Sequence, residues 1–148
     1  MPDRRRAVLV GWLAVGLIAC AARPARQGSA GGGGARQVEP GKPFTLAAGE
    51  RGELDSPKRA IAFVAVESDS RCARDVTCVW SGDAVVVLEV GTGGELETLR
   101  LHSNLEPKRA RAAGIELELV ELSPYPVSTQ KIAAADYRAT LVARRADS

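Results

Sequence analysis

The side chains best suited to chemistry lie close together between residues 67 and 82. This stretch holds Cys72 and Cys78, one of the two tryptophans, Trp80, and a dense cluster of charged residues. Cysteine pairs bind metals, exchange disulfides or form structural bridges. A zinc site needs about four ligands, whereas the chain has one histidine, and redox pairs usually follow the spacing C-x-x-C. The spacing therefore favours a structural disulfide.

The charged residues of this stretch allow two main interpretations. Asp69, Arg71, Arg74 and Asp75 can pair with one another or cap backbone N–H groups, which makes the loop a self-satisfied connection. Alternatively, these four residues and Trp80 form a binding loop, since functional groups often lie on loops held by a rigid scaffold. For the Trp80 indole itself, we expect a buried position beside the disulfide rather than an exposed anchor.

Two other kinds of site have less support. A hydrolytic triad can be assembled from Ser81, His102 and Asp83, but the chain lacks the G-x-S-x-G turn that presents a nucleophilic serine. Calcium prefers oxygen ligands, and four carboxylates are near in sequence: Glu67, Asp69, Asp75 and Asp83. Their spacing matches no standard calcium loop. We therefore predict no catalytic site, no metal and no cofactor.

The first twenty residues have the three parts of an export signal. Arg4–Arg6 form a charged start, residues 7–18 form an apolar run, and small residues follow. The run is too short to span a bilayer as a helix, which takes about 20 residues. Its ending, Leu17-Ile-Ala-Cys20, resembles the lipobox of bacterial lipoproteins. The resemblance implies cleavage after residue 19 and a diacylglycerol thioether on Cys20 that anchors the chain in a membrane. A plain secretory signal is the alternative.

Residues 20–41 are expected to link this anchor to a folded domain. They contain the run Gly31–Gly34 among Arg, Pro, Gln and Ser, with no periodic apolar pattern, so we predict a flexible linker. Ala21 and Ala22 lack the aspartate that retains enterobacterial lipoproteins at the inner membrane, which favours the outer membrane, facing the periplasm. The chain has 20 basic and 18 acidic side chains, and the excess lies before Cys20. A neutral mature chain gives no electrostatic reason to expect nucleic acid.

Residues 42–145 are predicted to form one antiparallel β-sandwich, immunoglobulin-like in architecture. Period-2 alternation and short apolar runs indicate strands at 43–46, near 53–54, and at 60–66, 84–90, 95–102, 115–119 and 137–143. Gly91–Gly94 predicts a hairpin. The basic residues 104–113 are expected to form a solvated, loosely helical turn. Tyr137 at the last strand is reminiscent of the tyrosine corner of immunoglobulin-like sandwiches.

Lipidation of Cys20 leaves two cysteines in an exported chain, where disulfides persist, so we predict a Cys72–Cys78 bridge. The segment around it, D-S-R-C-x5-C-V-W-S-G, resembles the D-S-R-C-P-x4-C-x-W-A-G signature of a family of small bacterial lipoproteins and secreted proteins with no assigned activity. The resemblance extends loosely over residues 43–143 and implies a fold and a compartment. The sequence departs from the signature at Ala73, where proline is favoured, and at Ser81, where alanine is favoured.

These observations predict a membrane-anchored envelope lipoprotein whose domain acts by binding or structural contact rather than by catalysis. Its partner would be an envelope protein or ligand. One alternative is an inhibitor-like module that presents the Cys72–Cys78 loop to an enzyme, since braced loops bind with little loss of conformational entropy. A small hydrolase is the other.

Overall fold

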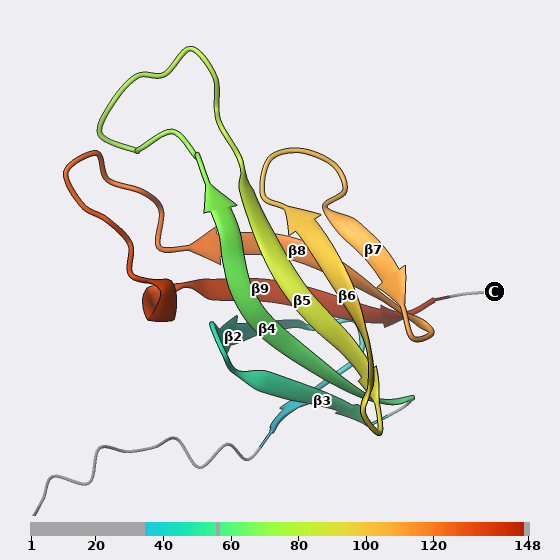
Figure 1. The fold of residues 1–148 in the computed structure, drawn as a ribbon. Coiled ribbons are helices and arrows are strands. Elements are labelled where there is room, and N and C mark those ends of the chain that lie inside the picture. The colour runs from blue at the N-terminus through green and yellow to red at the C-terminus, as the bar shows by residue number, and fades with distance from the viewer. Residues whose placement is uncertain (1–34, 56, 147–148) are drawn as a thin grey trace, which may run out of the picture. The chain divides into compact units, whose positions relative to one another are not determined.

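The computed structural model describes residues 35–55 and 57–146, which form an all-β fold (Figure 1). Its strands are β1 (Arg36–Val38), β2 (Pro43–Ala47), β3 (Arg51–Asp55), β4 (Lys58–Asp69), β5 (Ala84–Thr92), β6 (Glu95–His102), β7 (Arg109–Ala112), β8 (Ile115–Ser123) and β9 (Arg138–Arg145). A short 3-10 turn, η1 (Ala134–Asp136), precedes β9. No helix in this part of the chain is long and apolar enough to cross a membrane. The predicted signal peptide, Cys20 and most of the predicted linker lie outside the described residues.

The strands form two sheets that pack face to face, which confirms the predicted sandwich. One sheet has the order β1-β3-β4-β5-β6 and the other β2-β9-β8-β7. All neighbouring strands are antiparallel except β1 and β3, which are parallel. Because β3 to β6 follow one another in both sequence and space, the order differs from the ABED and CFG sheets of an immunoglobulin domain.

One apolar core lies between the sheets, and the alternation in the sequence explains which side chains enter it. Along β5, Val86, Leu88 and Val90 are buried as predicted. On β8, the predicted alternation also holds, since its first three buried side chains are leucines or isoleucine separated by glutamates. β4 is a central strand whose Ile61 and Phe63 are fully buried. Branched aliphatic residues fill most of the core, which agrees with the small number of aromatics in the chain.

Two predictions about the secondary structure and the start of the domain are wrong. Residues 109–112, expected to be part of a helical turn, form the edge strand β7, paired with β8 through a tight turn at Ala113 and Gly114, both with positive φ. The ladder and an ion pair between Arg111 and Glu116 hold this basic strand, so an apolar pattern is not needed. The predicted linker ends too late, because β1 pairs with β3 and its Val38 is buried.

Candidate functional site

The loop between β4 and β5, residues 70–83, projects beyond one end of the sandwich (Figure 1). Its base continues the pairing of the two strands, because the Ser70 N–H donates to the Asp83 carbonyl at 2.7 Å and the Cys72 N–H to the Ser81 carbonyl at 2.8 Å. At Gly82, φ is +65°, and a Cβ atom there would lie 1.8 Å from the Ser70 carbonyl oxygen. Only glycine lets the two sides of the loop approach this closely.

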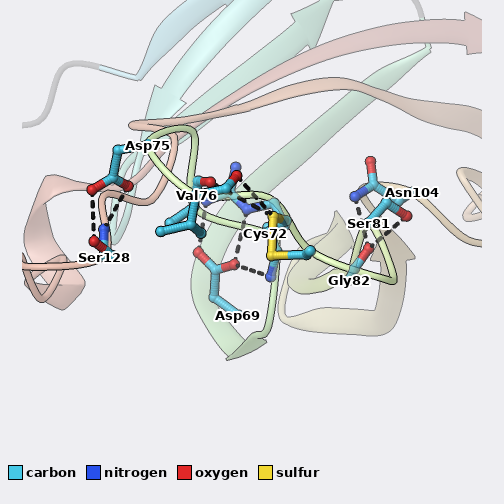
Figure 2. The surroundings of a disulfide bond; sticks show 11 residues. Asp69, Cys72, Asp75, Val76, Ser81, Gly82, Asn104 and Ser128 are labelled. Atoms are coloured by element: carbon cyan, nitrogen blue, oxygen red, sulfur yellow. Dashed lines mark hydrogen bonds and ion pairs between the residues drawn. A yellow bond between two sulfur atoms is a disulfide. The ribbon is translucent and has the colours of Figure 1, made fainter.

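The predicted disulfide between Cys72 and Cys78 is present, with 5.9 Å between the two Cα atoms. Figure 2 shows it between two contacts that hold the loop from either side. On one side, the Asp75 carboxylate accepts hydrogen bonds from the N–H and hydroxyl of Ser128, at 2.8 and 2.6 Å. On the other side, the Asn104 side chain donates to the Gly82 carbonyl at 2.8 Å. The loop is therefore fixed to two neighbouring loops as well as closed on itself.

Arg71 and Asp69 form a buried ion pair beneath this loop. The Arg71 Nε donates to Asp69 Oδ1 at 2.9 Å, and its Nη2 donates to Oδ2 at 2.6 Å. The two side chains are only 2% and 9% exposed. The guanidinium also donates to the carbonyls of Leu122, at 2.5 Å, and Pro124, at 3.0 Å, and lies over the Tyr125 ring. It joins the end of β4 to the chain that leaves β8 in the other sheet.

The Tyr137 hydroxyl completes this network by donating to Asp69 Oδ2 at 3.0 Å. The bond joins the two sheets, whereas a tyrosine corner bonds to backbone a few residues upstream, so the resemblance to that motif does not hold. Burial acts to raise the pKa of Asp69, but the hydrogen bonds and charge of Arg71, together with the Tyr137 hydroxyl, lower it below its ordinary value. Burial and the Asp69 carboxylate raise the pKa of Tyr137 to about 12.

This network changes the interpretation of two predicted binding residues. Asp69 and Arg71 are almost fully buried in their mutual ion pair, so they hold the loop rather than present free charges to a partner. Arg74 and Asp75 remain exposed, although Asp75 is engaged by Ser128. The backbone N–H of Arg74 also donates to the Pro126 carbonyl at 3.0 Å. Of the two interpretations of the charged residues, a self-satisfied loop describes Asp69, Arg71 and Asp75.

Asp83 is the centre of a second polar cluster, at the start of β5. His102 Nδ1 lies 2.5 Å from Asp83 Oδ2, while the Ser103 hydroxyl and the Asn104 N–H donate to Oδ1. Burial acts to raise the pKa of Asp83, but these donors together lower it. An ionised carboxylate only accepts hydrogen bonds, so Nδ1 of His102 carries a proton. The carboxylate fixes the loop that follows β6.

The triad considered from the sequence is only partly assembled. Asp83 and His102 do meet, but the hydrogen bond of the Ser81 hydroxyl goes to the Gly82 carbonyl at 3.5 Å. The four carboxylates considered for calcium have separate partners: Arg100 for Glu67, Arg71 for Asp69, Ser128 for Asp75 and His102 for Asp83. In the described part of the chain, no group of three or more potential ligands converges on a metal position.

Trp80 lies at the surface, contrary to the prediction that it fills the core beside the disulfide. Its exposed fraction is 82%, and that of Val79 is 91%. The reason is topological, because the loop carries both residues past the end of the sheets, where no core exists to receive them. The whole run of residues 74–81 is exposed. Trp80 is therefore the one apolar member of the predicted binding loop that is available for contact.

Sequence reasoning did not identify the other exposed apolar residues at this end of the domain. Val79, Leu105, Val120 and Tyr125 are also exposed apolar residues, and all lie in or beside the loops of this end. Tyr125 stands between two prolines, which keep it out of a strand and indicate a displayed side chain. For Val79, Leu105 and Val120, the local sequence gives no indication of exposure, because the exposure of a valine or leucine depends on which elements pack over it.

Comparisons of the chain with protein-family models, with curated proteins and with solved structures found no match. The resemblance of residues 69–82 to a lipoprotein signature therefore stays a prediction.

Proposed function

We propose that the chain is a lipoprotein of the bacterial envelope, anchored through Cys20, whose sandwich is a non-enzymatic binding module. The anchor rests on the lipobox-like residues 17–20, and an outer-membrane position facing the periplasm rests on Ala21 and Ala22. The observation that carries the binding role is the exposure of Val79 and Trp80 on a loop that is braced from within and from both sides.

The bracing matters because it lowers the cost of binding. A flexible loop loses conformational entropy when a partner orders it, at about 0.5–1.5 kcal/mol for each immobilised side chain. Here the disulfide, the Arg71–Asp69 pair and the contacts of Asp75 have already ordered the backbone. Tryptophan is also among the residues that contribute most to protein interfaces, typically about 2 kcal/mol or more when it is truncated. The tip is thus suited to entering an apolar pocket of an envelope protein.

The anchor is tested by cell fractionation and mass spectrometry. Wild-type protein should sediment with membranes and carry acyl mass on an N-terminal Cys20, and Cys20→Ala should lose both. Soluble, unmodified wild-type protein would disprove the anchor without bearing on the loop.

The binding tip is tested by placing a photo-crosslinking amino acid at position 79 in living cells. A discrete adduct with a partner should form, and Trp80→Ala should abolish it. Leu96→Ala is the matched control, because Leu96 is an exposed apolar residue of β6 beside the hairpin to β5, away from the loop. The proposal fails if no adduct forms, or if Trp80→Ala and Leu96→Ala leave the same adducts.

An inhibitor-like function is the second candidate, favoured by the exposed, disulfide-closed run of residues 74–81. Such a loop can lie in an enzyme's active-site cleft. A panel of peptidases with the purified protein tests it, and Trp80→Ala should weaken any inhibition. No inhibition at micromolar concentration across the panel excludes this candidate.

A further inference from the structure

A small pocket lies beside the projecting loop, between β8 and the loops that follow β6 and β8. Its volume is about 180 Å³. Buried Leu119 and Leu122 are among the residues that line it, with the more exposed Val120 and Tyr125. Val120 reaches this position because the β8–β9 register shifts between Leu119 and Glu121, which leaves Val120 as an extra residue turned outward.

The size of the pocket limits what it can hold. Pockets for drug-sized ligands have about 300–1,000 Å³, so this one is too small for most metabolites. An apolar cavity of about 150 Å³ holds a benzene molecule. The pocket therefore matches a single aromatic side chain. Glu121 and Asn104 also line it and supply oxygen acceptors, which an indole N–H needs when it is buried.

This chain itself displays a suitable side chain at the same end. In the described residues, the exposed aromatic side chains are Trp80 and Tyr125. Tyr125 is already part of the pocket wall. Trp80 does not occupy the pocket of its own molecule, since its side chain is almost fully in solvent. The two features are held close together, because the Asn104 side chain, at the pocket, bonds the Gly82 carbonyl of the loop.

We propose that the partner of Trp80 is a second copy of this chain, with the indole of each copy entering the pocket of the other. A knob and a pocket on one end of a molecule are self-complementary, which is the condition for a two-fold symmetric contact. The charges on the exposed loop also permit this two-fold contact. Arg74 and Asp75 carry opposite charges on the exposed loop, so two copies do not bring together a field of one sign.

The contact is small, so it forms mainly where copies of the chain are concentrated. An aromatic side chain buries about 150–250 Å². Two such insertions fall short of the 1,200–2,000 Å² that stable interfaces bury in total. The association is therefore weak in dilute solution and is favoured when copies share one membrane, where tethering raises their effective concentration. In this respect the inference rests on the proposed lipid anchor and on the proposed role of Trp80.

The experiment uses full-length lipidated protein reconstituted into phosphatidylcholine vesicles, with donor and acceptor dyes at the C-terminus. Energy transfer should rise with protein density above the level for random mixing. Trp80→Ala should weaken association on the order of 1,000-fold, because each dimer loses two interface tryptophans and each loss costs about 30-fold. Leu96→Ala, exposed on β6, should behave as wild type.

A mixing experiment distinguishes this contact from any other use of Trp80. Val120→Trp should block the pocket while leaving the loop intact, and as an exposed position it should tolerate the change. Alone, Trp80→Ala and Val120→Trp should each fail to associate. Mixed together, they should recover part of the wild-type energy transfer, because the Trp80 of one variant can enter the open pocket of the other and so restore one of the two insertions.

Several results would overturn the inference. Wild-type energy transfer at the random level, or transfer that Trp80→Ala does not reduce, shows that the copies do not meet through the loop. No recovery on mixing two folded variants shows that the pocket is not the receptor. If the copies stay apart while the crosslinker at position 79 captures a different protein in a Trp80-dependent manner, the binding module stands and only the second copy is wrong.

Discussion

Replacing Arg71 with alanine should cause the domain to unfold at a much lower temperature. The substitution removes the cation from a pair whose side chains are 2% and 9% exposed, and leaves the Asp69 carboxylate charged and buried. It also removes the donors to the Leu122 and Pro124 carbonyls. Breaking one partner of a buried pair typically costs about 3–5 kcal/mol. For a domain of this size, that corresponds to a fall in melting temperature on the order of 15 °C.

Thermal unfolding followed by circular dichroism measures this effect, with Arg74→Ala as the matched control. Arg74 lies in the same loop and carries the same charge, but it is exposed, so its removal should change stability by less than about 0.5 kcal/mol. The double variant Asp69→Asn, Arg71→Ala should be no less stable than Arg71→Ala alone, because the uncompensated charge is gone. If Arg71→Ala melts within about 3 °C of wild type, the pair does not hold the loop.

The same pair predicts how stability changes with acid. The folded-state pKa of Asp69 is lowered, so the pair contributes its full stabilisation at pH values above the ordinary pKa of an aspartic acid side chain. This contribution is lost as the pH falls through the lowered, folded-state pKa. The stability of Asp69→Asn should therefore fall less steeply than that of wild type on the acid side. Equal slopes in urea titrations at several pH values would contradict the assignment.

Three further predictions concern other parts of the site. The pKa of Tyr137 is raised to about 12, so the contribution of the neutral phenol to stability is complete below pH 10. Up to about 3 kcal/mol should be lost as the pH rises from 10 to 12, and Tyr137→Phe should lack this alkaline loss in urea titrations. Gly82→Ala should cost at least about 2 kcal/mol in urea unfolding, whereas Gly49→Ala, with positive φ but open space, should cost less. Reduction of Cys72–Cys78 should lower the melting temperature on the order of 10 °C, and free thiols in protein freshly isolated from cells would contradict the bridge.

The features of this domain that depend on local pattern could be predicted from the sequence alone. Alternation places Ile115 and Leu117 inward and Glu116 outward whatever they pack against, because successive side chains of a strand point to opposite faces. The hairpin at Gly93 and Gly94 follows from their access to positive φ. The disulfide could be expected from the C-x5-C spacing and from the lack of enough further ligands for a zinc site.

Which residues are buried at the loop end depends on contacts between distant parts of the chain. Arg71 and Arg74 are alike in sequence, yet one lies between the sheets and the other in solvent, because partners about 50 residues away receive Arg71. Trp80 is apolar, but its loop leads away from the core, so a prediction of burial from hydrophobicity alone was wrong. Strand β7 could not be predicted for the same reason. Its residues have no apolar pattern of their own, and it is a strand because it forms an antiparallel ladder with β8. Burial is a property of what packs over a residue, and the packing elements here come from distant parts of the chain.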